Sequence, residues 1–150
     1  MFFFEGPFPE WKAFVACASS WFLAQSIKVL RNSIQRKRFN LRWLFDTGGM
    51  PSSHSAGVVS VATAVGLYYG FSSIIFLIAL VFAIVTMFDA AGVRRAAGKQ
   101  ARILNKMTEE LFEKGLIKEE RLKELLGHTP IEVFAGAFLG ILITILICSS

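Results

Sequence analysis

The sequence predicts an all-α integral membrane protein, a helical bundle of about four transmembrane helices with a cytoplasmic amphipathic helical segment. Two observations carry this prediction. Hydrophobic residues make up 54% of the 150-residue chain, and its mean hydropathy of +0.54 is high for a soluble domain. Residues 55–88 also form a run without a single charged side chain. A chain of this length is expected to fold as one domain over residues 1–150.

Each expected span is a predominantly apolar stretch with polar or turn-forming residues at its ends. The uncharged run is too long for one span and suits two short ones. Its break is expected at residues 69–73, where Gly70 and two serines interrupt the apolar residues. Trp11 and Trp21 are expected as interfacial anchors of the first span. The four expected spans are residues 11–27, 55–70, 73–90 and 131–148.

The distribution of basic residues predicts the orientation in the membrane. Apart from Lys12, all lysines and arginines fall within residues 28–42 and 94–123. The positive-inside rule therefore places segments 28–54 and 91–130 in the cytoplasm and both termini outside. The amphipathic pattern from Lys99 to Leu126 predicts helices that lie on the membrane or over the bundle.

The formal net charge of +5 also bears on which partners the protein binds. A basic cytoplasmic surface favours an anionic membrane leaflet. Nucleic acid is not expected as a partner, because the sequence has no helix-turn-helix, zinc-finger or RNA-binding signature.

A polar segment, Gly48–Ala56, leads directly into the uncharged run. It contains Gly49, Ser52, Ser53 and His54 at the expected start of a helix. Such a start offers backbone N–H groups and the positive end of the helix dipole to an anion. His54 adds a group that titrates near neutral pH. In the alternative interpretation, Ser52 or Ser53 only caps the helix and His54 is an interfacial residue.

A second histidine stands just before the last expected span. Glu132 follows His128 by four residues, so the two side chains can meet across one helical turn. A carboxylate on one ring nitrogen would leave the other nitrogen directed at a substrate. Thr129, Pro130 and Glu132 also form a capping-box pattern, which would explain Glu132 without chemistry. Both interpretations stay open at the level of sequence.

Two further polar clusters stand at span ends, and the predicted topology brings all four clusters to the cytoplasmic end. Gln25 and Lys28 close the first span, where Lys28 alternatively snorkels to the interface. Asp89, Arg94 and Arg95 close the third, where the arginines alternatively act as stop-transfer charges. No further aspartates follow Asp89 at metal-binding spacing, and no zinc-ligand pattern occurs. The sequence therefore predicts neither a metal nor a cofactor.

Three ordered motifs together resemble the divergent type-2 phosphatidic acid phosphatase family. These are small bacterial and plastid membrane proteins, also described as acid phosphatase/vanadium-dependent haloperoxidase-related. The resemblance extends from about Gln25 to Gly140. The motifs are Gly48–Ala56, Asp89–Ala101 and Leu126–Val133.

The resemblance implies a role for each motif residue. His128 would be the nucleophile that forms a phosphohistidine, and Glu132 would orient it. His54 would protonate the leaving oxygen, and Ser53 would bind phosphate. Compared with the wider superfamily, Ser53 replaces a glycine and Glu132 replaces an aspartate.

The superfamily's first motif, Lys-x6-Arg-Pro, and an arginine that precedes the nucleophilic histidine are both absent from this chain. Lys28 is the candidate for the missing lysine. Arg94 and Arg95 are the candidates for the missing arginine, because phosphoryl transfer needs cations around the equatorial oxygens.

These inferences predict a metal-independent phosphatase that hydrolyses a phosphomonoester or pyrophosphate of a lipid in the bacterial inner membrane. The alternative is a non-catalytic protein that binds lipid phosphate headgroups or acts as a scaffold. The Gly136–Gly140 spacing permits a homodimer through close helix contact. The same glycines alternatively pack inside the monomer.

Overall fold

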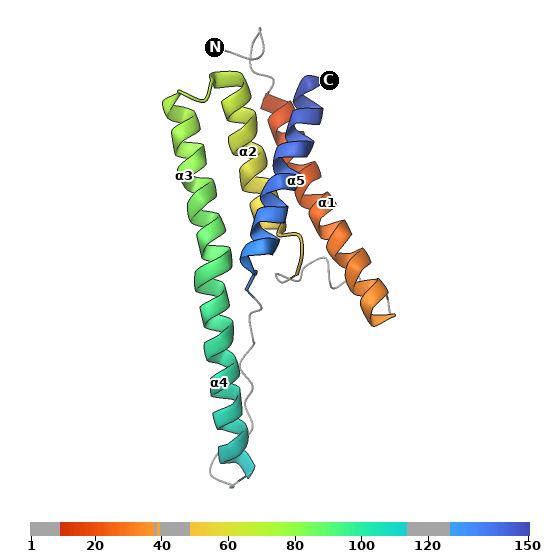
Figure 1. The fold of residues 1–150 in the computed structure, drawn as a ribbon, viewed down its shortest axis with the longest axis vertical. Helices are drawn as coiled ribbons and strands as arrows, with labels where there is room; N and C mark the ends of the chain where they lie inside the picture. Colours follow the sequence, from red (N-terminus) through yellow and green to blue (C-terminus); the bar gives the residue numbers. More distant parts are fainter. Residues whose placement is uncertain (1–9, 38, 40–48, 114–126) are drawn as a thin grey trace.

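The computed structural model describes residues 10–37, 39, 49–113 and 127–150, and every regular element within these residues is a helix (Figure 1). The predicted all-α fold is confirmed. The elements are α1 (Glu10–Arg36), α2 (Ser53–Tyr69), α3 (Ile74–Phe88), η2 (Asp89–Val93), α4 (Arg94–Glu113) and α5 (Pro130–Ser149).

Helix α2 lies at the centre of the bundle and packs against α1, α3 and α5. Small residues make this packing close: a Cβ atom at Gly136 would overlap the Ser52 carbonyl, and one at Gly140 would overlap the Ala56 carbonyl. Further along the same seam, the hydroxyls of Ser60 and Thr144 are 2.7 Å apart and hydrogen-bonded. The Gly-x-x-x-Gly spacing therefore joins α5 to α2 within one chain, and it no longer argues for a homodimer.

The turn between α2 and α3 is where the sequence predicts it. Gly70 follows the last residue of α2 with a φ of 84°, a left-handed conformation that favours glycine. Ser73 then caps α3, since its hydroxyl accepts a hydrogen bond from the Phe76 N–H at 3.2 Å. The predicted break at residues 69–73 is confirmed.

The segment after α3 differs from its prediction. Instead of ending near residue 90, the helix continues through the π-helical turn η2 into α4. Figure 1 shows α4 extending from α3 away from the other helices, so it does not lie over the bundle. The physical reason is that no proline interrupts residues 74–113, and Gly92 and Gly98 weaken a helix without ending it. The remainder of the expected amphipathic segment, residues 114–126, lies outside the described residues.

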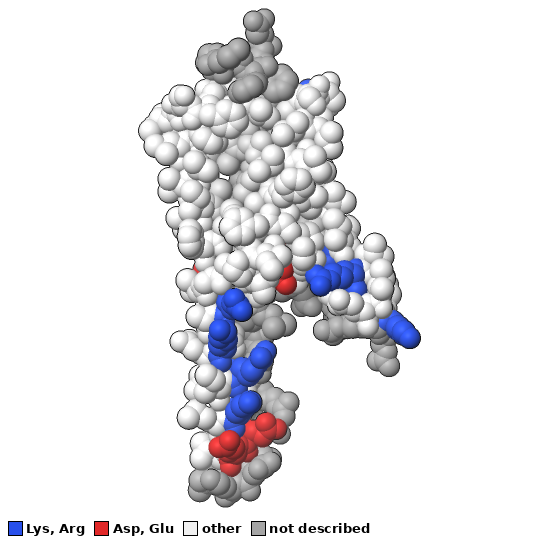
Figure 2. Space-filling model, viewed as in Figure 1, with Lys and Arg blue, Asp and Glu red and all other residues white. Residues whose placement is uncertain are grey.

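Three helical stretches are long and apolar enough to cross a membrane: Glu10–Gln35, Ile74–Leu111 and Pro130–Ser149. Helix α2 has 17 residues, a length of about 25 Å at 1.5 Å per residue, and it lies among these stretches. A fourth span made by α2 therefore stays a prediction. Figure 2 shows the α4 end of the molecule carrying most of the charged side chains, while the face over α2, α3 and α5 is almost uncharged.

Candidate active site

The His128–Glu132 pair forms at the start of α5. The Nδ1 atom of His128 lies 3.2 Å from Oε2 of Glu132. The same Oε2 accepts the Thr129 N–H at 3.0 Å, and the Glu132 N–H donates to the Thr129 hydroxyl at 3.4 Å. The capping box and the histidine–carboxylate pair thus coexist, because one carboxylate oxygen serves both. With Nδ1–H donating to Glu132, Nε2 carries the lone pair.

Backbone hydrogen bonds fix this pair relative to α2 and η2. The His128 N–H donates to the Ala90 carbonyl at 3.0 Å, and the Ser52 N–H donates to the Glu132 carbonyl at 2.9 Å. Ala90 lies inside η2, and a π-helical turn changes which carbonyls are used within the helix. Three elements that are distant in sequence therefore meet at His128.

The other ring nitrogen of His128, Nε2, is buried. The residue is 1% exposed, and Nε2 makes no hydrogen bond of ordinary geometry to any described residue. A buried polar atom without a partner is uncommon in proteins and needs an explanation. A ligand that hydrogen-bonds to Nε2 would supply one.

Lys28 approaches the same histidine from α1. Its side chain is also 1% exposed, and its stem runs past Gly49, whose Cβ position lies 3.4 Å from Lys28 Cγ. Gly49 has a φ of 96°, so a glycine is favoured there on backbone grounds as well. A buried ammonium group needs compensating negative charge or hydrogen bonds. Its position beside a histidine, and not on the protein surface, is what an anion site requires.

The electrostatic surroundings favour the neutral form of His128 by lowering its pKa. Burial is the largest influence and lowers its pKa from the ordinary value of 6.5, and the Lys28 charge lowers the pKa further. Glu132 and the Gly49 backbone oppose this shift without reversing it. A neutral imidazole with Nδ1 bonded to a carboxylate is the form in which Nε2 acts as a nucleophile.

The first turn of α2 faces this histidine. Ser52 is the N-cap, because its hydroxyl accepts from the Ser55 N–H at 3.4 Å and from the Ser55 hydroxyl at 3.1 Å. Ser53 begins the helix and is buried, and His54 is partly buried. The cap interpretation thus holds for Ser52. The cap therefore uses the Ser55 N–H of the first turn of α2.

The two histidine rings are close enough to share one ligand. Their centroids are 6.5 Å apart and their planes are inclined by 61°. A tetrahedral phosphate that contacts both rings at about 2.8 Å is compatible with this spacing. The structure therefore brings together residues from α1, α2 and α5 that the sequence analysis selected. They are Lys28, Gly49, Ser52, Ser53, His54, His128 and Glu132.

The remaining predicted residues stand elsewhere. Arg95 is exposed in the first turn of α4, and no described contact joins it to His128. Arg94 begins α4, but its side chain lies outside the described part of the structure. Gln25 is buried on α1, one turn before Lys28. Of the predicted basic residues with described side chains, Lys28 is the one placed beside the histidine.

Two contributors were missed by sequence reasoning. Ala90 acts through its backbone carbonyl, and Ser55 acts by binding the Ser52 hydroxyl. Both belong to motifs that the sequence analysis singled out. Their roles were not predictable, because a backbone carbonyl leaves no side-chain signature and a π-helical turn has no clear sequence signal.

Fold and site together define a class of protein, a membrane protein whose described elements are all helical and that pairs a buried histidine with a carboxylate at one end of its bundle. The chain belongs to the divergent PAP2 family, whose sequence pattern matches residues 10–143. It is 45% identical over 135 residues to the uncharacterized membrane protein YuiD of Bacillus subtilis (strain 168). That match covers 83% of this chain and 85% of YuiD. No solved structure matches the chain.

Proposed function

We propose that this protein is a metal-independent lipid phosphatase that hydrolyses a phosphomonoester or pyrophosphate of a lipid through a phosphohistidine intermediate. The observation that carries the proposal is His128. It is buried, its Nδ1 contacts Glu132 at 3.2 Å, and its Nε2 has no partner among the described residues. Membership of the divergent PAP2 family supports a relation to phosphatases.

The proposed reaction has two steps. Nε2 of His128 attacks phosphorus, so that a P–N bond forms while the P–O bond to the lipid breaks, and His54 gives its proton to the departing oxygen. Water then attacks phosphorus and gives a proton to His54. The P–N bond breaks, inorganic phosphate leaves and both histidines return to their starting state. Each step needs a positioned acid or base within hydrogen-bond reach of the reacting oxygen.

Two features supply the positive charge that phosphoryl transfer requires. Lys28 is buried beside His128, and the first turn of α2 presents backbone N–H groups and the positive end of the helix dipole. Preorganised donors of this kind stabilise the charge that spreads over the equatorial oxygens in the transition state. The proposal assigns the stabilisation of the phosphate charge to these groups and not to a metal ion.

The proposed side of the membrane follows from charge. The buried site lies at the end of the bundle from which α4 extends, and α4 carries lysines and arginines in its first half (Figure 2). The positive-inside rule assigns that end to the cytoplasm. An anionic leaflet would then concentrate phosphorylated lipids near the site. A membrane-impermeant thiol reagent should label an Arg95→Cys variant from the cytoplasmic side; labelling from the outside would reverse the orientation.

The experiment that tests the proposed activity uses purified protein in detergent with phosphatidic acid and a lipid pyrophosphate as substrates. Wild-type protein should release inorganic phosphate in the presence of a chelator, and His128→Ala should release none. Phe138→Ala, a change at an exposed α5 position, serves as the matched control and should retain activity. Undiminished phosphate release by His128→Ala would overturn the nucleophile assignment.

A second candidate function is binding of lipid phosphate without turnover. Arg95 is exposed, so Lys28 is the one basic side chain that the described contacts place beside His128. A single basic side chain stabilises the transition state of phosphoryl transfer less than two would, which favours binding without turnover. In that case phosphatidic acid would bind in a manner that depends on Lys28, and no phosphate would be released. The same assay combined with a binding measurement separates the two functions.

A further inference from the structure

A cavity of about 390 Å³ lies between α3 and the first two turns of α5, beside the candidate active site. Every side chain that lines it is apolar. This volume falls within the range of about 300–1,000 Å³ that is typical of small-ligand sites. Its lining includes Met87, Phe88, Ala91, Pro130, Val133 and Phe134. We call it the α3–α5 groove.

Two residues of the groove lining stand next to the candidate active site along the backbone. Pro130, in its lining, follows His128 by two residues. Ala91, also in its lining, follows Ala90, whose carbonyl accepts the His128 N–H at 3.0 Å. The buried histidine and the purely apolar wall of the groove are therefore separated by less than one helical turn of chain.

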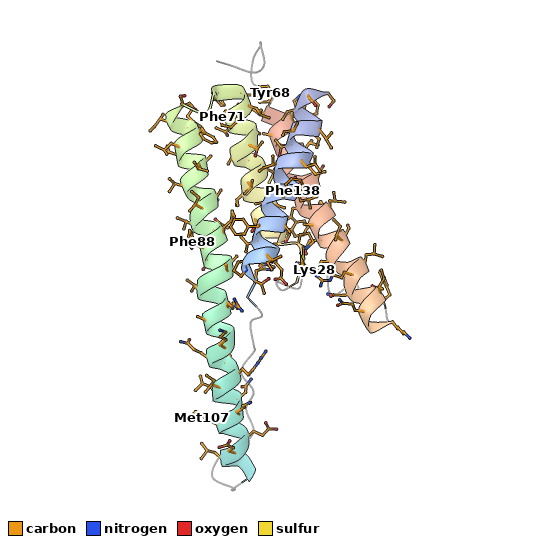
Figure 3. All side chains as sticks on the ribbon, in the orientation of Figure 1. Lys28, Tyr68, Phe71, Phe88, Met107 and Phe138 are labelled. Carbon is orange, nitrogen blue, oxygen red and sulfur yellow. The ribbon has the colours of Figure 1, made fainter. Side chains whose placement is uncertain are left out.

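The groove also lies where a membrane changes from polar to apolar. Most side chains of α3 are exposed, with Ala83 as its buried residue, which suits a helix that faces lipid tails. Asp89 follows α3 immediately, and charged residues become frequent beyond that level (Figure 2). Figure 3 shows Phe88 on α3 and Lys28 on α1 at similar heights of the bundle, with the start of α5 between them. A membrane lipid has the same order of polarity, with its phosphate at the interface and its chains in the apolar layer.

We infer that the α3–α5 groove seats a hydrocarbon chain of the phosphorylated substrate, which enters sideways from the bilayer between α3 and α5. This inference rests on the proposed function, since it treats the site around His128 as the place where the phosphate binds. The groove is too small for a partner helix with side chains, which is about 10 Å across. Bulk lipid is as apolar as the groove, so moving the chain from one to the other changes the binding free energy little. The phosphate group therefore provides the affinity for the site, and the groove orients the hydrocarbon chain.

The test is photolabelling of the purified full-length protein with two probes that share one chain. Both carry a diazirine in an alkyl chain; one ends in a phosphate and the other in a hydroxyl. We expect the phosphate probe to label peptides containing Met87 or Phe134 about tenfold more than the hydroxyl probe, because charge-assisted hydrogen bonds hold its headgroup. The experiment is repeated with His128→Ala, so that labelling does not depend on turnover.

Two matched variants show whether the groove itself holds the chain. Ala91→Phe fills the groove and should remove most of the phosphate-dependent labelling. Ala96→Phe makes the same exchange at an exposed position of α4 and should leave it unchanged. If Ala91→Phe does not fold, Phe134→Ala removes one wall and should weaken the labelling severalfold.

The possible outcomes test the role of the groove separately from the proposed catalysis. Equal labelling by the two probes, or labelling that Ala91→Phe leaves intact, would overturn the inference even if phosphate release is observed. If the wild-type protein is labelled as predicted but releases no phosphate, the groove is supported and the proposed phosphatase activity is overturned.

Discussion

Besides its packing against α1, helix α5 has two seams, toward α2 and toward α3, that differ in their construction. Against α2 the contact is close, with Gly136 and Gly140 beneath backbone carbonyls and a buried hydroxyl pair between Ser60 and Thr144. Against α3 the contact is loose, and it leaves the apolar α3–α5 groove. His128 precedes α5 and is the point where the two seams meet. Under the proposals above, one seam positions the reacting groups and the other leaves room for the lipid chain.

The largest expected effect concerns the polar side of His128. Lys28→Met should lower phosphate release about 10²–10³-fold, the range seen when one preorganised donor to a transition-state oxyanion is removed. Lys12→Met, at the other end of α1, is the control and should change the rate little. Steady-state kinetics on both variants measures the rate of phosphate release. A Lys28→Met rate close to wild type would mean that the buried ammonium does not serve the phosphate.

The next effect compares the two seams directly. Gly136→Leu should lower the free energy of unfolding by about 3 kcal/mol, because its side chain meets the Ser52 backbone, which cannot move aside cheaply. Ala91→Leu places a similar volume at the groove and should cost less than about 1 kcal/mol. Thermal unfolding in one detergent measures both. Equal losses would show that the seams do not differ in packing.

A pH profile examines the histidine–carboxylate pair. The nucleophile must be neutral, so activity is present above the pKa of His128 and is lost as pH falls through it. Since that pKa is lowered, the acidic limb should lie below pH 6.5. Glu132→Gln removes an influence that raises the pKa, so the limb should move to still lower pH.

The rate of Glu132→Gln should also fall, by about 10–100-fold, as the charged hydrogen-bond partner is lost. Glu110→Gln, an exposed position on α4, is the control. A limb that shifts upward in Glu132→Gln, or does not move, would contradict the assigned pair.

The smallest effect concerns the hydroxyl pair in the tight seam. Ser60→Ala should destabilise the protein by about 1 kcal/mol, because hydrogen bonds between membrane helices are modest in strength. The double variant Ser60→Ala/Thr144→Val should cost less than the sum of the single variants, since the buried partner is removed as well. Unfolding measurements on the full cycle test this, and strict additivity would argue that the two hydroxyls are uncoupled.

Local sequence signals predicted much of this molecule. The turn at Gly70, the cap at Ser52 and the His128–Glu132 pair each depend on residues within one or two helical turns, where spacing alone determines contact. The placement of Lys28 beside His128 followed from the charge-based topology and the family resemblance.

Features that depend on tertiary packing were not predictable. Helix α3 continues into α4 through the π-helical turn η2, and no side chain in this segment signals such a turn. The groove exists because the glycines of α5 face α2 and not α3. The sequence around Gly136 does not indicate whether this residue faces α2, α3 or a second chain. The difference between the two seams therefore appears only in three dimensions.

The most direct test of the central claim is to trap the phosphorylated enzyme. Wild-type protein is mixed with a lipid phosphate that carries a radiolabelled phosphorus atom, quenched in alkali and digested. We expect an acid-labile, alkali-stable phosphate on the peptide that contains His128, and no labelled peptide in His128→Ala. Turnover without a phosphoenzyme, or with the phosphate on another residue, would contradict it.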